Sequence, residues 1–431
     1  MWYISKASQT LTLEESHNMD TKAAMQSLQN KIRRFSPGDL DACETIYLIA
    51  FALWLAFQLL DTALVGPVIA GPVLKAVRYG CIGLLFFSEL LGGRYGKRTM
   101  IWVVLAWIVC IGAINSGQAF YIDCVLFVFC ARNVPMDKIL RVALWVSSII
   151  CAGIIICAFA GIIPNIIFGD PDRPRYMLGF RYMLFPSMIV FNITCIVVLL
   201  KRYDFSVFHA ILLIAANLAI YLATNARLSF ILAIVAILAG LCGSLSKKYF
   251  AQWGFKLKKA IASRPAKILA YAVFPLCIII MLALTLAFNP QIPCMRDLDT
   301  FLVGRLFYGH QAIETYGFTW FGQEITTIGN GLDASGIAAV QGSYNYIDSL
   351  YVKLFVQIGI IPALVFFGGF TALCVWAYKR SDWFFLAMLV ILAVHLTIDD
   401  LSFALKYDIL LLYLSLPLSH KAAAKEMKGS Q

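Results

Sequence analysis

The chain has 431 residues, of which 61% are hydrophobic and only 14% are charged, and its mean hydropathy is +0.80. A water-soluble domain of this length could not bury so much apolar surface, which excludes the soluble enzyme classes and indicates that lipid is the solvent. The formal net charge of +11 comes largely from basic loops between apolar runs, so it does not indicate nucleic-acid binding. The composition predicts an all-α polytopic membrane protein.

Apolar runs recur along the chain, and most are long enough to cross a hydrocarbon core about 30 Å thick. We predict about twelve transmembrane helices, and because two of the runs are short, counts of ten or eleven stay open. The predicted spans are residues 43–62, 71–90, 99–114, 118–131, 140–163, 180–200, 206–224, 226–245, 268–288, 347–378, 383–400 and 403–418.

The basic residues gather in both tails and in alternate loops, a pattern that predicts cytoplasmic termini. The expected order is a cytoplasmic tail over residues 1–42, spans 1–9 over 43–288 and one large outer loop over 289–346. Spans 10–12 follow over 347–418, with a second cytoplasmic tail over 419–431.

Metal-binding motifs are weak in this sequence. Eleven of the twelve cysteines fall in predicted spans or at their ends, and no CxxC pair occurs, so we interpret them as small apolar side chains. The tripeptides DPD (170–172) and DLD (297–299) match the DxD pattern of nucleotide-sugar enzymes. Neither follows a phosphate-cradling glycine loop, so no metal and no other cofactor is predicted.

Two outer segments, residues 161–181 and 289–346, are much longer than the other connections. Long ordered loops in compact proteins are usually functional. Within the second, GRLFYGHQAIETYG (304–317) has helical spacing, with an apolar face ending in Ala312, Ile313 and Tyr316. We expect a short amphipathic helix along the outer membrane surface.

Arginines are unexpectedly frequent at the predicted outer end. Arginine suits bidentate phosphate binding, so Arg175, Arg181, Arg227 and Arg305 are candidate ligands for a phosphate group. Simpler interpretations stay open. Arg227 could be a snorkelling interfacial arginine, and Arg305 could pair with an acid of the DLD tripeptide.

Asp348 stands where residues 342–362 pass from a polar loop into an apolar helix. It could serve as a helix cap, as a catalytic base, or as both. His310 could be a surface histidine or a second base. Tyr308, Tyr344 and Tyr351 could stack on sugar rings or belong to an interfacial belt. Other ionisable residues expected near the outer leaflet are Lys353, His395, Asp399 and Asp400, of which His395 and Asp399 are spaced to pair.

These residues sit in motifs that resemble those of a known family. TNARLSFILAIVAIL (224–238), VGRLFYGHQAIETYGFTWFGQ (303–323), YIDSLYVKLFVQIGIIPALVFF (346–367) and RPRYMLGFRYMLFPS (173–187) resemble motifs of Wzy-type polysaccharide polymerases and O-antigen ligases, in the same order. The similarity covers about residues 170 to 380. The sequence departs from the family pattern in having Asn225 and Ala226 before Arg227, and Ser349 where asparagine is common.

The resemblance implies a fold similar to the GT-C glycosyltransferases. It also implies a metal-independent enzyme that polymerises undecaprenyl-diphosphate-linked repeat units outside the bacterial cytoplasmic membrane. Such products include O-antigen, capsule and exopolysaccharide. Arg227 and Arg305 would stabilise the departing diphosphate, with Asp348 as first and His310 as second choice of base. Arg175, Arg181, Tyr308, Tyr344 and Tyr351 would bind substrate. A flippase and a chain-length regulator are the partners implied, besides membrane lipid.

Two alternatives remain at this point. An O-antigen-type ligase would transfer finished glycan to an anchor, but the ligases it resembles usually carry histidine where Asp348 stands, which favours the polymerase. A flippase or other transporter of lipid-linked oligosaccharide would line a path across the bilayer with its charges. The sequence instead concentrates those charges towards the outer end.

Overall fold

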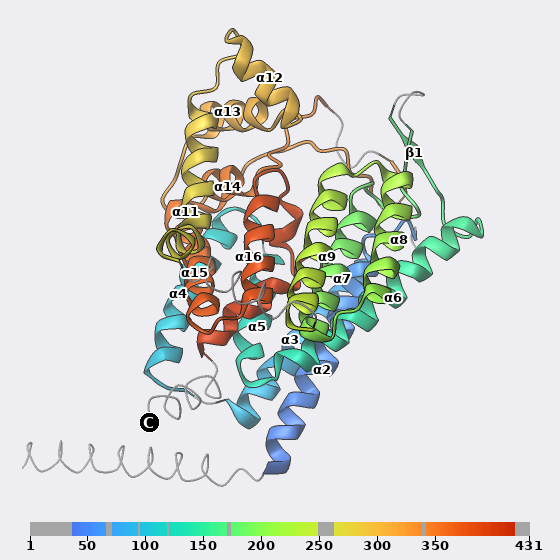
Figure 1. Cartoon of the computed structure of the whole chain (residues 1–431), viewed down its shortest axis with the longest axis vertical. Coiled ribbons are helices and arrows are strands. Elements are labelled where there is room, and N and C mark those ends of the chain that lie inside the picture. The colour runs from blue at the N-terminus through green and yellow to red at the C-terminus, as the bar shows by residue number, and fades with distance from the viewer. Residues whose placement is uncertain are drawn as a thin grey trace, which may run out of the picture.

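The structure, a computed structural model, describes residues 37–65, 71–93, 95–118, 120–169, 174–248, 263–333, 335–337 and 342–418. Most of the predicted N-terminal tail, the predicted C-terminal tail and the DPD tripeptide lie outside these residues. The described chain is almost entirely helical, apart from one two-stranded hairpin (Figure 1).

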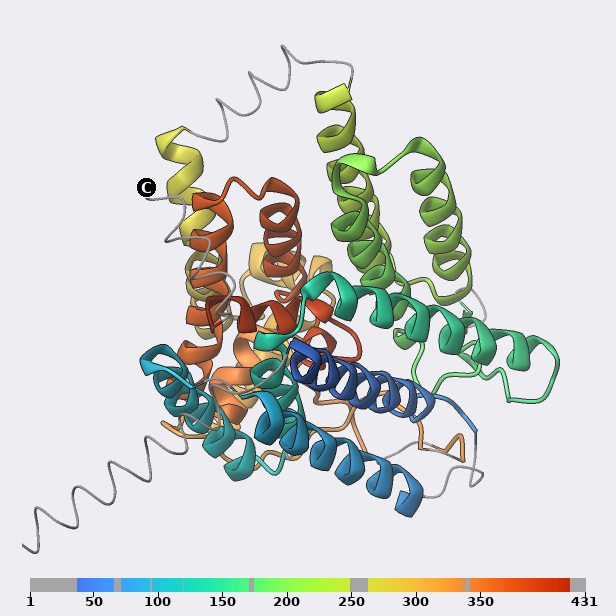
Figure 2. The ribbon, with the colours of Figure 1, turned by 90° about the horizontal axis from the view of Figure 1, so that it is seen from below.

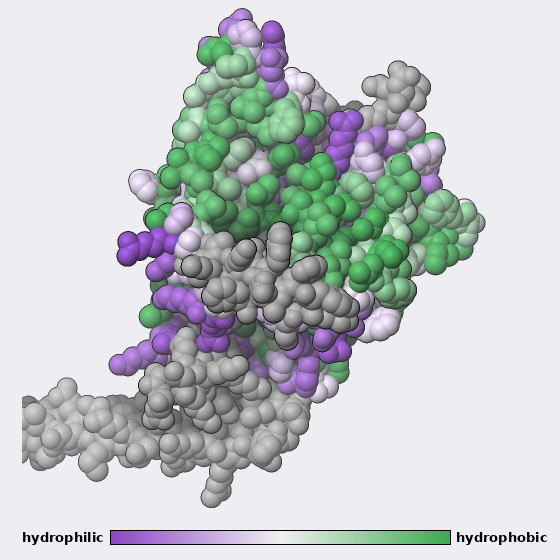
Figure 3. All heavy atoms as spheres, viewed as in Figure 1, coloured by the Kyte–Doolittle hydropathy of each residue, from purple (hydrophilic) through white to green (hydrophobic). Residues whose placement is uncertain are grey.

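Eight helices in the described residues are long and apolar enough to cross a membrane. Hydrophobic side chains form a broad band across the face seen in Figure 3, with hydrophilic ones above and below it. The chain is therefore a multi-pass α-helical membrane protein. The helices are α2 (Pro37–Leu60), α4 (Lys97–Asn115), α6 (Met136–Phe159), α7 (Phe185–Lys201), α8 (Val207–Thr224), α9 (Arg227–Lys248), α11 (Arg264–Leu286) and α15 (Ile360–Lys379).

The other elements are shorter or more polar. Helix α3 (Gly71–Gly92) has spanning length but carries Lys75, Arg78 and Glu89. The remaining elements are α5 (Phe120–Cys130), η2 (Ala131–Asn133), β1 (Ile167–Phe168), β2 (Arg175–Tyr176), η3 (Arg202–Asp204), α12 (Pro293–Phe301), α13 (Arg305–Tyr316), α14 (Leu350–Lys353), η4 (Leu354–Ile358), α16 (Trp383–His395), η5 (Leu401–Phe403) and η6 (Ile409–Leu418).

Seen from below, α2 lies between α3 and α6, while α7, α8 and α9 pack against one another, with α7 also contacting α6 (Figure 2). An ion pair between the half-buried Arg78 and the buried Asp123 ties α3 to α5: Nε of Arg78 lies 2.5 Å from Oδ2 of Asp123. Nε1 of Trp54 donates to the same oxygen at 3.4 Å. Charges are tolerated inside a membrane protein when they are paired in this way.

The predicted span 347–378 is broken in the structure. It begins as the short helix α14, continues as the π-helical turn η4, and only then becomes the spanning helix α15. Gly359 joins η4 to α15 with a φ of +103°, a backbone conformation that favours glycine. Both α14 and η4 are buried, so residues 347–358 form a folded entry to the helix and do not face lipid.

The last two predicted spans are also shorter than expected. Helix α16 ends at His395, and residues 401–418 form the 3₁₀ segments η5 and η6 in place of an α-helix. The 13 residues of α16 extend about 20 Å, less than the roughly 30 Å of a hydrocarbon core. Asp399 and Asp400 consequently lie in the turn after α16, outside the helix in which the sequence placed them.

The long loop is held firmly against the helices. The backbone N–H of Gln323 donates to the carbonyl of Gln357 at 2.9 Å, and Nδ2 of Asn115 donates to the carbonyl of Phe321 at 2.9 Å. Helix α13 covers the stretch for which the sequence predicts a helix, but its apolar side packs onto α11 and η4. The expected position of this helix along the outer membrane surface stays a prediction.

Candidate functional site

We call the end of the molecule that carries α12 and α13 the loop end (Figure 1). Two adjoining cavities lie there, the larger of them bordered by Arg305 and Tyr308 of α13. The larger has a volume of about 470 Å³ and the smaller about 140 Å³. Both are bordered by Tyr182, Leu184, Asn330, Tyr344 and Asp399, so they form one continuous site.

The larger cavity gathers the arginines. Its border includes Arg175, Arg227 and Arg305, with Tyr308 and Tyr344 between them. These residues come from β2, from the N-termini of α9 and α13, and from the segment before α14. Five of the nine site residues named from the sequence therefore meet at one cavity, and Asp348 joins them through the smaller one.

Local chain geometry explains how Arg227 reaches the cavity. Helix α8 ends at Thr224, and Asn225 adopts a left-handed conformation with a φ of +56°, which reverses the chain. Helix α9 then begins at Arg227, so this exposed guanidinium stands beside a helix N-terminus. Nε of Arg175 donates to the carbonyl of Thr224 at 2.8 Å, which fixes β2 against the same turn.

Arg305 and Asp348 are joined where the two cavities meet. Nη2 of Arg305 lies 3.4 Å from Oδ2 of Asp348, and the hydroxyl of Tyr344 donates to that oxygen at 2.7 Å. The ring of Tyr344 packs edge-on against Tyr308, with centroids 4.8 Å apart. The carboxylate is thus oriented by a cation and by a phenol. The helix-cap interpretation of Asp348 is not what the structure shows, because Ser349 is the N-cap of α14.

The environment of Asp348 shifts its proton affinity. The residue is only 9% exposed, and burial raises its pKa above the ordinary value although the Arg305 guanidinium opposes the shift. Burial and the neighbouring carboxylate also raise the pKa of Tyr344, which keeps this phenol protonated and able to donate. A carboxylate of increased basicity that borders a cavity is suited to accept a proton.

A second cation, carboxylate and tyrosine meet behind the first. Nζ of Lys353 lies 2.6 Å from Oδ2 of Asp400 and donates to the hydroxyl of Tyr346 at 2.7 Å. The Tyr346 hydroxyl donates to the same Asp400 oxygen at 2.8 Å. Asp400 and Tyr346 border the smaller cavity, and Lys353 is buried beneath them.

Asp399 borders both cavities. Its Oδ1 accepts the backbone N–H of Leu401 at 2.7 Å, and its Oδ2 lies 4.0 Å from Nε2 of His395. His395 and Asp399, which their spacing predicts to pair, are therefore close but form no hydrogen bond through these atoms. Burial, together with the nearby Asp400 carboxylate, raises the pKa of Asp399 to about 8.

Three residues named from the sequence do not border either cavity. Arg181 pairs with Asp61, with Nη2 and Oδ1 3.3 Å apart. His310 faces α11, where its Nδ1 is 2.9 Å from the carbonyl of Thr285. Tyr351 is fully buried and donates to the carbonyl of Ala393 at 2.8 Å. The expected sugar-binding role of Tyr351 therefore has no geometric basis, and His310 is turned away from the site.

Sequence reasoning overlooked Tyr182 and Asn330, and it flagged Asp399 without giving it a role. Tyr182 directly follows Arg181 in the motif that the sequence singled out, so proximity was the available signal. Asn330 follows a glycine in a turn-rich stretch that gives no chemical signal. Arg305 pairs with Asp348, which was not the expected partner in the DLD tripeptide. Asp299 of that tripeptide instead accepts the backbone N–H of Leu306 at 2.8 Å, in the first turn of α13.

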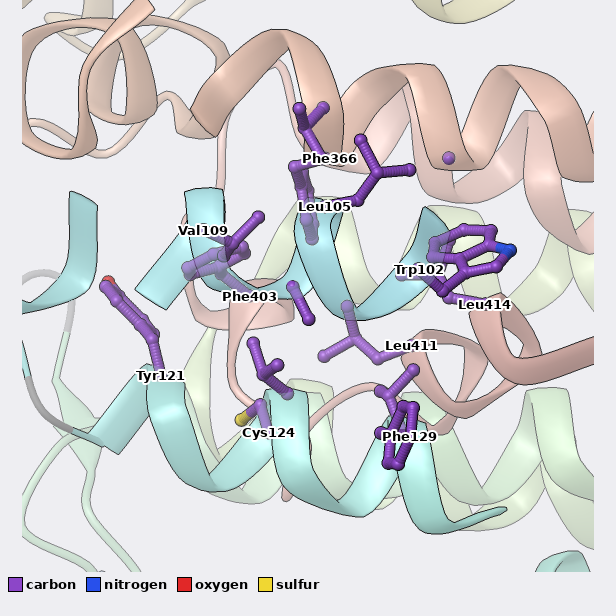
Figure 4. A pocket seen from close by; sticks show the side chains of 15 residues that line it. Trp102, Leu105, Val109, Tyr121, Cys124, Phe129, Phe366, Phe403, Leu411 and Leu414 are labelled. Atoms are coloured by element: carbon purple, nitrogen blue, oxygen red, sulfur yellow. The ribbon is translucent and has the colours of Figure 1, made fainter. Parts of the chain in front are cut away.

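A third, apolar cavity of about 90 Å³ lies between α4, α5, α15 and η6 (Figure 4). Its border includes Trp102, Phe366 and Leu414, and the ring of Tyr121 stands at one end. The Tyr121 hydroxyl interacts electrostatically with Lys353 and Asp400.

Among the residues that the structure describes, no three His, Cys, Asp or Glu side chains are grouped in a way that could hold a metal ion. Chemically, the site combines arginines for an anionic group, carboxylates for proton transfer and tyrosines for stacking. Comparison of the chain with protein-family models, with curated proteins and with solved structures finds no match.

Proposed function

We propose that this protein is a polysaccharide repeat-unit polymerase similar to the Wzy type. It would transfer a growing glycan from undecaprenyl diphosphate to a hydroxyl of another lipid-linked repeat unit. The acceptor hydroxyl attacks the anomeric carbon, the bond from that carbon to the diphosphate oxygen breaks, and the diphosphate leaves with the bonding electrons. The product would be an O-antigen, capsule or exopolysaccharide chain.

One observation carries the proposal: Asp348 and Arg305 meet at the junction of an arginine-lined and a carboxylate-lined cavity. Glycosyl transfer from a lipid diphosphate needs cations that stabilise the leaving group and a base near the acceptor hydroxyl. Arg175, Arg227 and Arg305 would bind the diphosphate in the larger cavity. Asp348 would accept the hydroxyl proton in the smaller one.

The tyrosines fit the same reaction. Tyr308 and Tyr344 form an edge-to-face pair on the border of the larger cavity. Aromatic faces with polar tips stack on the apolar faces of sugar rings while their hydroxyls form hydrogen bonds. We infer that this pair contributes to the sugar subsite, together with Tyr182 and Asn330, which border both cavities.

The proposal includes a location. The loop end would face outward from the bacterial cytoplasmic membrane, with both termini inside and a GT-C-like arrangement of about twelve membrane-embedded segments. A flippase would supply the lipid-linked units at this face, and a chain-length regulator would act beside the polymerase. The placement of His310 against α11 gives less support to a ligase that uses this histidine as its base.

The test is the size distribution of surface glycan in a host that lacks the gene and is complemented with variants. Wild-type protein should restore long chains, and Asp348→Asn should leave single repeat units at the outer face. His310→Gln should restore long chains. Long chains that persist on the lipid carrier after deletion would indicate a ligase, and units trapped inside would indicate a flippase. Either result would refute the proposal.

A further inference from the structure

At the smaller cavity, the buried carboxylates outnumber the cations that are paired with them. Asp348, Asp399 and Asp400 all border the smaller cavity. The cations paired with this group are Arg305 and Lys353. Three ionised carboxylates and two cations would leave one uncompensated negative charge in a buried site. Such a charge is costly, and protonation of one carboxylate is the usual way in which a protein avoids it.

The geometry indicates which carboxylates are ionised. Asp348 has a cation at 3.4 Å and a tyrosine hydroxyl at 2.7 Å. Asp400 has a cation at 2.6 Å and a tyrosine hydroxyl at 2.8 Å. Each is thus held by one cation and one phenolic donor. Both kinds of partner stabilise the charged form of a carboxyl group.

Asp399 has neither partner. The backbone N–H of Leu401 is its hydrogen-bond donor in the described chain. His395 is 4.0 Å away and its Nε2 forms no hydrogen bond. The other ionisable groups that interact with Asp399 are Asp400, Asp348, Arg305, Tyr182 and Tyr407. Two of these are carboxylates that disfavour a third negative charge.

We propose that Asp399 is the protonated carboxyl of this site and its proton donor. The proposal rests on the function proposed above. Asp399 borders the larger cavity together with the arginines, whereas Asp348 borders the smaller one. In the transfer, Asp348 takes the proton of the acceptor hydroxyl, and Asp399 gives its proton to the departing diphosphate oxygen. Asp399 regains a proton and Asp348 loses one to solvent through the open cavities, so charge and atoms balance over a turnover.

This assignment divides the acid and base roles by environment. Two carboxyl groups whose surroundings push their proton affinities apart are the usual arrangement of a general acid and a general base. Burial raises the pKa of both carboxyl groups, but the cation and phenol beside Asp348 oppose the rise, whereas Asp399 has no paired cation and keeps its neutral acid form. The raised pKa of Asp399, about 8, agrees with this division.

Infrared difference spectroscopy of the full-length protein in lipid nanodiscs tests the proposal without any substrate. The carbonyl stretch of a protonated carboxylic acid should be present at about pH 6 and disappear around pH 8. The component that disappears around pH 8 should be absent from Asp399→Asn protein, whereas a component from the buried Asp408 carboxyl, whose pKa burial raises to about 7, should remain. Asp333→Asn is the matched control, because Asp333 lies in an exposed turn of the same loop, where asparagine can keep the turn, and the signal should persist.

The outcomes separate the two proposals. If the signal is missing from wild-type protein near neutral pH, or is lost in Asp348→Asn instead, Asp399 is not the proton carrier, whether or not glycan is polymerised. If the signal belongs to Asp399 but no glycosidic bond is formed by the protein, the proposed function fails alone. If the Asp399→Asn protein does not accumulate, Asp399→Glu replaces it in the experiment. The carbonyl stretch of the protonated acid must then shift in frequency, because the carboxyl group belongs to a different side chain.

The donor role has its own readout. Polymer formation by the wild type should decline above about pH 8 as Asp399 loses its proton. Asp399→Asn should lower turnover about 100-fold and abolish that alkaline decline, since general acid–base groups contribute roughly 10²- to 10⁴-fold. An unchanged alkaline decline in Asp399→Asn would overturn the role.

Discussion

Replacing Gly322 with alanine should destabilise the protein by forcing apart three backbones that meet at one point. A Cβ at Gly322 would lie 2.7 Å from the carbonyl oxygen of Ile358 and 2.9 Å from that of Gly112. Neither neighbour is a flexible side chain, so relief requires that α4 or the η4–α15 junction move. Gly322 also has a φ of +91°, which strains any residue with a side chain.

The expected size of the effect combines two contributions. Overpacking of a tight site costs about 1–3 kcal/mol, and a left-handed conformation for a non-glycine residue costs about 1–2 kcal/mol. The unfolding free energy of Gly322→Ala should therefore fall by about 2–5 kcal/mol. Gly317 is a matched control, because its φ is +66° but nothing lies within 4 Å of a Cβ placed there. Gly317→Ala should show the backbone cost alone.

Thermal or denaturant unfolding of the purified protein in detergent measures the difference between these variants. Gly322→Ala should also reduce protection of the loop amides from hydrogen exchange, because the close contact of Gly322 with Gly112 and Ile358 anchors the segment after α13. If Gly322→Ala is no more destabilising than Gly317→Ala, the three backbones do not meet as closely as the structure indicates, and the loop is anchored elsewhere.

Further predictions concern charge. Folding stability should decrease as pH rises from about 4 to 8, because the pKa of Asp399 is raised to about 8 in the folded state, so the folded protein binds the extra proton in this range. In Asp399→Asn, the dependence of the melting temperature on pH should become shallower over that interval. Arg227→Ala should lower polymer formation about 100-fold through weaker leaving-group stabilisation, whereas Arg296→Ala, at an exposed position on α12 outside the cavities, should not. Asp123→Ala should destabilise the protein by about 1–3 kcal/mol, because it removes a buried carboxylate that accepts from Arg78 at 2.5 Å and from Trp54 at 3.4 Å; equal melting temperatures of variant and wild type would contradict this.

The membrane class and most spanning helices could be predicted from the sequence, because a helix that crosses the hydrocarbon core must consist of a long run of apolar residues. This criterion gives a wrong prediction for a segment that is apolar because it is buried inside the protein and does not face lipid. Residues 347–358 are buried on all sides, and the π-helical turn and the kink at Gly359 cannot be read from hydropathy. The same limitation explains why residues 403–418 were expected to be one α-helix.

Part of the site could also be predicted from the sequence. Arginines and tyrosines in an otherwise apolar chain indicate a function; Arg305 and Asp348 do meet, and Arg227 borders the same cavity as Arg305. Tyr351 was placed in the site because it follows Asp348 by about one helical turn, and we expected both side chains to face the same cavity. In the structure its hydroxyl instead donates to the carbonyl of Ala393. The pairing of Lys353 with Asp400 joins residues 47 positions apart, which no local pattern reveals. Without that pair, Asp399 could not be distinguished from its neighbour.

The most direct test of the account is elongation of lipid-linked repeat units by the purified protein in liposomes, with units extracted from the deletion host. Wild-type protein should convert single units into a ladder of longer chains on the lipid carrier, without added metal. Asp348→Asn should produce no ladder, while His310→Gln should match the wild type. A ladder of normal length from Asp348→Asn, or none from the wild-type protein, would contradict the central claim.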